Sequence, residues 1–313
     1  MAPVVEVRYR VEERPAKRVG RRRPPVLATV PRESLGYRLV AQILAIIAVL
    51  SLSFLVELTV LGNLRHDRDQ AHLAAQFRVE LAKGTAPVGP LDDMNAPLAI
   101  GTPVALLEIP RLKLRQVVVE GTSSTALMSG PGHRRDTPLP GQVGASVVAG
   151  RRATYGAVFW SINQLRAGDE IIVTTGQGRS SLAVLGVRHA GDLVPPALAR
   201  GRGRLTLVTT DGPALVPTSV LFVDAEVTSA ALSRPAQLAS RELGPAEAMM
   251  AGDSSALLGA FLWSVLLAAA ATAAVWFRFQ AGMWPAWALA LPVLVALDLL
   301  AVDDIAALLP NLL

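Results

Sequence analysis

Apolar residues are distributed along this chain in two ways: in three long runs near its ends, and in short alternating runs between them. Residues 39–56 form the first long run, which carries no charge and is extended by residues 58–61. The second run covers residues 254–277, and the third covers about residues 284–302. Because roughly 20 apolar residues cross a bilayer as a helix, the pattern predicts about three transmembrane helices.

The second and third runs are separated by a short turn that contains Gly282 and Pro285, and Arg278 stands just before it. We expect a helical hairpin with this arginine at its cytoplasmic tip. Trp284 and Trp287 suit the aromatic belt at a membrane interface. A third run that is re-entrant or lies on the membrane surface is the alternative.

Residues 98–228 have a different texture, with short β-rich runs separated by Gly, Pro and Asp. Seven or eight short strands at this spacing predict a closed β-barrel or a sandwich. Residues 123–129 and 159–165 read as short helices. The predicted strands are residues 104–109, 116–120, 145–149, 170–175, 181–187, 204–209 and 220–227.

The stretch after the first apolar run, residues 63–83, mixes apolar positions with many charges and predicts a helical stalk. His66 and His72 lie in this stalk and are expected to be solvated. A proline- and glycine-rich linker follows. The predicted divisions are 1–38 (basic disordered tail), 39–61 (signal anchor), 62–97 (stalk and linker), 98–228 (β domain), 229–253 (linker), 254–278 (transmembrane helix) and 279–313 (second hairpin helix and tail).

Charge and composition support a membrane protein. The 313 residues are 51% hydrophobic, and the net charge is +5. Ten Lys or Arg against four Glu fall within residues 1–38, directly before the first apolar run. Such a basic segment holds an N-terminus in the cytoplasm, which we prefer to the alternative of a nucleic-acid-binding arm. We therefore predict the cell membrane, and no nucleic acid, as a partner.

The chain contains no cysteine, which excludes disulfides, thiolate metal sites and a cysteine nucleophile. No cluster of His, Asp and Glu has the spacing of a metal site in the sequence. We predict neither a metal nor a cofactor.

Several motifs of the β domain occur in the order and spacing of one known family. Together, from about Leu106 to Val227, they resemble the sortase family, most closely the class E type of high-GC Gram-positive bacteria. The motifs are Gly130-Pro-Gly-His133, Thr137-Pro-Leu-Pro-Gly141, Gly144-Ala-Ser-Val-Val-Ala-Gly150-Arg151-Arg152 and Arg204-Leu-Thr-Leu-Val-Thr-Thr210-Asp211.

Sortases are extracytoplasmic cysteine transpeptidases that cut a sorting signal and join the protein to a cell-wall or pilus amine. The resemblance implies a closed eight-stranded β-barrel outside the plasma membrane of an actinobacterium. Class E members usually have one anchor, so the hairpin after residue 253 is a departure from the family. It implies a further contact with the membrane or with a partner within it.

The chain departs from the family at each position that carries the chemistry. The family has histidine where Arg151 stands, and cysteine where Thr210 stands. It has arginine at the start of the last strand, which falls at Val220 or Ser219 here. A threonine hydroxyl is a far weaker acid than a thiol, and an arginine stays protonated, so it cannot serve as a base.

The sequence therefore predicts a catalytically degenerate member of the family. Its predicted role is to bind or assemble cell-surface or pilus proteins, or to bind an active sortase as its partner. The alternative is a transpeptidase or hydrolase that uses Thr210 in place of cysteine. Arg151 and Arg152 lie either in a binding groove or on the surface. His189 is expected in a loop, without a catalytic role. The candidate groove residues are Arg151, Arg152, Thr210, Asp211 and His133.

Overall fold

The computed structural model describes residue 44 and residues 48–313, except 93 and 95. The predicted basic tail, 1–38, and the start of the predicted anchor lie outside the described residues. Contacts divide the chain into Met1–Ile46 and Ile47–Leu313. All that follows concerns the second unit.

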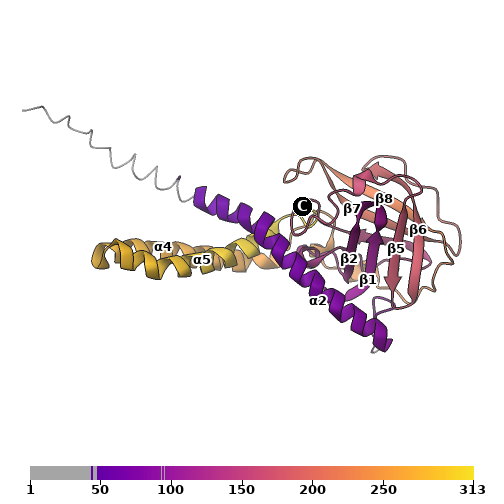
Figure 1. Ribbon diagram of the computed structural model, residues 1–313, viewed down its shortest axis with the longest axis horizontal. Coiled ribbons are helices and arrows are strands. Elements are labelled where there is room, and N and C mark those ends of the chain that lie inside the picture. Colours follow the sequence, from indigo (N-terminus) through magenta and orange to yellow (C-terminus); the bar gives the residue numbers. More distant parts are fainter. Residues whose placement is uncertain (1–43, 45–47, 93, 95) are drawn as a thin grey trace, which may run out of the picture. The chain divides into compact units, whose positions relative to one another are not determined.

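Eight strands close into a barrel in the order β1-β2-β3-β4-β7-β8-β6-β5, which confirms the predicted closed eight-stranded barrel (Figure 1). Neighbouring strands of the barrel are antiparallel, except that β2 pairs in parallel with β3 and β4 pairs in parallel with β7. The strands are β1 (Pro103–Ile109), β2 (Leu114–Glu120), β3 (Gly132–His133), β4 (Gly144–Ala149), β5 (Glu170–Thr175), β6 (Gly178–His189), β7 (Gly203–Asp211) and β8 (Ser219–Val227).

The barrel core forms because alternate residues of each strand point to opposite faces, and the apolar set points inward. Ala105, Leu107 and Ile109 of β1, for example, are fully buried in one cluster with Leu205 and Leu207 of β7. Burying apolar surface in this way is the main stabilising contribution to the domain.

The helices of the described part comprise the six-residue α3 (Ser124–Ser129), as expected, and longer helices outside the barrel. Ser123 caps α3, because its hydroxyl accepts a hydrogen bond from the Ala126 N–H. The others are η1 (Glu57–Leu61), α2 (Gly62–Lys83), α4 (Leu257–Ala281), α5 (Met283–Leu308), and the short η2 (Pro110–Leu112), η3 (Ile162–Gln164), η4 (Ser240–Glu242), η5 (Pro245–Glu247) and η6 (Ser254–Ala256).

The helix predicted over 159–165 is wrong: only η3, a single 3₁₀ turn, forms there. Phe159, Ile162 and Leu165 are all buried in the core. Their spacing of three matches the 3₁₀ period, in which residues i and i+3 eclipse, rather than the α-helical period. The core contacts therefore hold this segment as a series of turns.

Three helical stretches of the described part are long and apolar enough to cross a membrane, judged by length and composition: Ala48–Lys83, Ser254–Arg278 and Trp284–Leu308. The first runs without a break through η1 into α2, so the stalk and the part of the predicted anchor from Ala48 onward form one helix. Figure 1 shows α4 and α5 side by side, and residue contacts along the two helices agree with this arrangement. Their turn is made at Gly282, whose φ of 89° lies in the region that favours glycine.

The stalk helix α2 packs against the barrel, and the expectation that His66 is solvated is wrong. This side chain is 1% exposed, and its ring contacts the Met128 carbonyl and the Gln116 side chain, each at 3.2 Å. One turn later, Gln70 donates to the Ser129 carbonyl at 2.7 Å and accepts from the Val117 N–H at 2.7 Å. Polar residues of the stalk thus complete hydrogen bonds of β2 and α3.

Candidate functional site

The register of the barrel places the candidate residues Arg151, Thr210 and Val220 at the ends of neighbouring strands. Parallel strands end at the same sheet edge, and β4 pairs in parallel with β7 so that Ala149 lies opposite Val208. The residues that follow β4, Arg151 and Arg152, therefore lie beside the end of β7. There, Thr210 pairs with Val220 of the antiparallel strand β8.

Arg151 is enclosed by the protein, with 0% of its surface exposed. Its guanidinium donates to the Thr154 hydroxyl at 3.1 Å and to the carbonyl and hydroxyl of Ser124 at 3.0 and 2.7 Å. The guanidinium carbon lies 5.0 Å from the ring centroid of Tyr155. Burial lowers the pKa of Arg151 to about 10, so it is still a cation at neutral pH.

Arg152 holds the end of β7. It donates to the Thr210 carbonyl at 3.0 Å and forms an ion pair with Asp211 at 3.2 Å. Its guanidinium also lies over the ring of Trp160, 5.3 Å from the centroid. Both arginines are thus buried, and the alternative in which they are surface residues is wrong.

Thr210 is 2% exposed, and its hydroxyl donates to the carbonyl of Leu312 at 3.3 Å. Residues 312 and 313 therefore occupy the place beside the end of β7 that Arg152, Ala153, Thr154 and Thr210 line, and we name this place the groove. Within the described ranges, no His, Asp or Glu side chain forms a hydrogen bond with this hydroxyl.

Asp211 follows Thr210 but points to the opposite face of the strand, because side chains alternate along β7. Its carboxylate lies 3.0 Å from Nε2 of His189, whose side chain is 49% exposed. The backbone N–H of Gly212 lowers the pKa of Asp211 below its ordinary value, and hydrogen bonding to His189 and the charge of Arg152 act in the same direction. His189 is thus paired with Asp211, a partner that the sequence did not indicate.

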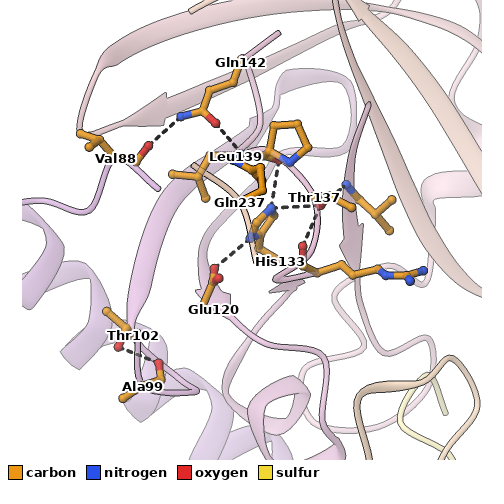
Figure 2. Close-up of polar contacts among 12 residues, drawn as sticks. Val88, Ala99, Thr102, Glu120, His133, Thr137, Leu139, Gln142 and Gln237 are labelled. Atoms are coloured by element: carbon orange, nitrogen blue, oxygen red, sulfur yellow. Dashed lines mark hydrogen bonds and ion pairs between the residues drawn. The ribbon is translucent and has the colours of Figure 1, made fainter. Parts of the chain in front are cut away.

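His133 lies inside the barrel wall, with 0% of its side chain exposed. Figure 2 shows its ring between Glu120 and Thr137. The ring nitrogens lie 2.8 Å from the Glu120 carboxylate, 3.2 Å from the Thr137 hydroxyl and 3.0 Å from the Pro138 carbonyl. Both ring nitrogens therefore have structural partners. The geometry gives His133 the role of holding the turn before β4.

Sequence reasoning missed Ser124, Thr154 and Leu312 as parts of this site. The hydroxyls of Ser124 and Thr154 accept hydrogen bonds from the buried Arg151 guanidinium, and no local sequence motif identifies these two residues. Leu312 lies 102 positions after Thr210, so no spacing rule relates them. Within the part of the chain that the structure describes, no group of three His, Cys, Asp or Glu side chains is arranged to hold a metal.

Comparison with known proteins agrees with this barrel and its motifs. Residues 107–223 match the family model described as the sortase domain. The barrel of this chain is therefore a sortase domain.

The individual relatives are similar over part of the chain. Sortase D of Bacillus subtilis (strain 168) is 31% identical over 85 residues, which are 27% of this chain and 41% of that protein. The chain thus spans about two fifths of the length of this curated relative. The structure of sortase E from Streptomyces avermitilis is 33% identical and covers 42% of this chain and 91% of its own, with a TM-score of 0.37. The structure of a Clostridium perfringens Sortase D5 transpeptidase is 20% identical and covers 52% of this chain and 99% of its own, with a TM-score of 0.43.

Proposed function

We propose that this chain is a membrane-anchored, class E-like sortase-domain protein that does not catalyse transpeptidation. In this proposal it is a binding or assembly factor for cell-surface or pilus proteins outside the plasma membrane. The observation that supports it is the content of the site: Thr210 pairs with Val220, and both the Thr210 hydroxyl and the Arg151 guanidinium make structural hydrogen bonds. The sequence resemblance assigns these three residues to the family's functional positions.

Acyl transfer through this site would need a nucleophile and a base. A thiol reaches its thiolate near neutral pH, since its pKa is about 8.5, whereas a threonine hydroxyl needs a base within hydrogen-bond reach. Arg151 is a cation with a pKa of about 10 and has no lone pair to offer. The Thr210 hydroxyl donates its proton to a carbonyl, which cannot remove it.

The alternative, a hydrolase that uses Thr210, would rest on the His189–Asp211 pair beside it. That pair has the geometry of a base and its orienting carboxylate. However, Asp211 and Thr210 are successive residues of β7 and face opposite sides. The pair is therefore poorly placed to serve this hydroxyl, and we favour the non-catalytic function.

Three apolar helices support the anchored part of the proposal. Trp160, which is 51% exposed and stacks on Arg152, lies at the edge of the site and offers a contact for a partner. Aromatic residues beside a cation are common anchors of protein interfaces.

The test uses the purified full chain in detergent micelles. Peptides from surface proteins of the source cells are incubated with the wild type and with Thr210→Ala, and intact mass reports any acyl adduct. We expect neither protein to gain mass or release product. A mass gain in the wild type that disappears in Thr210→Ala would overturn the non-catalytic proposal.

The binding role is tested in cells with a photo-crosslinking residue at Trp160, and with one at the exposed Arg179 of β6 as the matched control. We expect a cell-surface or pilus protein to be captured at position 160 and not at position 179. Equal capture at both positions, or none, would contradict the binding role.

A further inference from the structure

The segment that follows α5, residues 309–313, forms no regular element, yet residues 311–313 are buried. Asn311 is 1% exposed, Leu312 is 0% exposed and Leu313 is 6% exposed. Other parts of the domain must therefore cover these three residues.

The main chain of this segment is bound by the site residues themselves. The carbonyl of Leu312 accepts from the Arg152 N–H at 3.2 Å and from the Thr210 hydroxyl at 3.3 Å. The carbonyl of Leu313 accepts from the Ala153 N–H at 3.3 Å and from the Thr154 hydroxyl at 3.0 Å. The same Thr154 hydroxyl accepts a hydrogen bond from the Arg151 guanidinium. The buried arginine therefore positions a residue that holds the segment.

Two side chains of the segment make specific contacts with the domain. Asn311 donates through Nδ2 to the Thr122 carbonyl at 2.7 Å and to the Ala248 carbonyl at 2.9 Å. Leu312 belongs to an apolar cluster that fills the base of the groove. The other members are Leu127, Ala149 and Val208, with Val147, Val220, Phe222 and Met250 packed against them.

All three substituted positions therefore take part in holding this segment. Thr210 donates to it, Arg151 orients Thr154, and Val220 packs against the cluster that contains Leu312. A charged arginine at position 220 would place a cation in that apolar cluster, at a substantial desolvation cost. The replacements that remove the family chemistry are thus the ones that suit an apolar peptide.

We propose that the groove is a peptide site whose resident ligand is this chain's own segment 309–313, and that this contact clamps the end of α5 to the barrel. The proposal assigns an occupant to the site of the proposed function and so rests on that function for its biological use. Because the segment follows Leu308 of α5 directly, binding is intramolecular, with an effective concentration that reaches the millimolar range for short tethers. An external peptide enters only by displacing the segment, and it needs the same chemistry: a side-chain amide followed by an aliphatic residue.

The test exploits the absence of native cysteine. Thr210→Cys is introduced into the full chain in micelles, and the rate of reaction with N-ethylmaleimide is measured. Leu193→Cys, at a position that is 96% exposed, is the accessible control, and Leu207→Cys, at a core position that is 0% exposed, is the buried control. We expect position 210 to react far more slowly than position 193.

Two variants empty the groove by different means. Leu312→Ser removes the buried aliphatic side chain, and Asn311→Asp keeps the shape but loses the two donated hydrogen bonds. We expect Leu312→Ser to raise the labelling rate at position 210 by about 30-fold, as the loss of one buried leucine side chain predicts. Asn311→Asp should also raise this rate, because the two hydrogen bonds to the Thr122 and Ala248 carbonyls are lost. A synthetic peptide of residues 303–313 added to either variant should restore protection, whereas the same peptide with aspartate at position 311 should not.

Position 207 separates opening of the groove from unfolding, because its cysteine stays unreactive as long as the barrel is folded. Labelling at position 210 of the otherwise unchanged chain as fast as at position 193 would overturn the proposal. So would an unchanged rate in both Leu312→Ser and Asn311→Asp. Because labelling reports occupancy alone, its outcome is independent of whether an acyl adduct is found in the test of the proposed function.

Discussion

The guanidinium of Arg151 lies over the ring of Tyr155, with 5.0 Å between the guanidinium carbon and the ring centroid, and both side chains are 0% exposed. A buried cation against an aromatic face is stabilised by the ring quadrupole, more so where water is excluded. The same burial raises the pKa of Tyr155 to about 12. In the proposed function, this structural contact stands where the family has a catalytic imidazole.

Two substitutions at Tyr155 should separate the ring from the hydroxyl. Within the described residues, the hydroxyl has no hydrogen-bond partner, so Tyr155→Phe should change the free energy of unfolding very little. Tyr155→Ala removes the ring and should cost about 3–5 kcal/mol. Urea unfolding of the full chain in micelles measures both, and equal costs would contradict a role for the ring.

The buried pair of His133 and Glu120, 2.8 Å apart, should be essential to the fold (Figure 2). Removing one partner of a fully buried pair leaves the other uncompensated, so His133→Ala should cost about 3–5 kcal/mol. His189→Ala, which breaks a half-exposed pair, should cost no more than about 1 kcal/mol. Urea unfolding in micelles compares them, and similar losses in both variants would contradict this assignment.

Asp211 should make stability depend on pH in the acid range. Its folded pKa is lowered, first by the Gly212 N–H and then by His189 and Arg152. Its stabilising contribution is therefore complete above the unfolded pKa, about 3.9, and is lost as pH falls through the lower folded value. Urea unfolding of the wild type and Asp211→Asn should differ by up to about 1 kcal/mol at neutral pH. The difference should shrink below about pH 4, and a constant difference down to pH 3 would contradict it.

Arg65 of α2 contacts Asp303 of α5 and lies 3.5 Å from Glu57. Reversing the charge with Arg65→Glu should place three carboxylates together and lower the melting temperature in micelles. Adding Asp303→Arg should restore part of the loss, and only part, because Glu57 still faces the new glutamate. Arg68→Glu, at an exposed position of the same helix, is the control. A double variant no better than the single one would show that the pair does not join these helices.

The family chemistry should increase as the groove is emptied. A chain with Thr210→Cys, Arg151→His and Val220→Arg carries the three family side chains and already loses contacts that hold segment 309–313. We expect p-nitrophenyl acetate to give a burst of nitrophenolate that becomes larger when Leu312→Ser is added. The same chain with alanine at position 210 is the control. A burst of equal size without Leu312→Ser would argue against occupation of the groove.

Much of the fold followed from the sequence, because alternation along seven runs marks strands that bury one face. The two-residue strand β3 was missed, since Gly132 and His133 are too few to show an alternation. The residues 159–165 were misread because buried positions three apart satisfy either helix type over so short a stretch.

The site was predicted in part. The motifs named Arg151, Thr210 and either Val220 or Ser219, and the structure pairs Thr210 with Val220. The assignment of these residues to a binding site stays a prediction. The burial of His66 and of Leu312 was not predictable, since both depend on contacts with segments distant in sequence. The Thr210 and Thr154 hydroxyls donate to main-chain carbonyls. Every residue has such a carbonyl, so the sequence does not indicate which one is bound.

The direct connection between α5 and the bound segment has a mechanical consequence. Five residues of fully extended chain reach at most roughly 18 Å. If α5 is fixed in a bilayer, a load that lifts the barrel farther than this leash allows must pull the segment out. The occupancy of the groove would then depend on the mechanical load between α5 and the barrel.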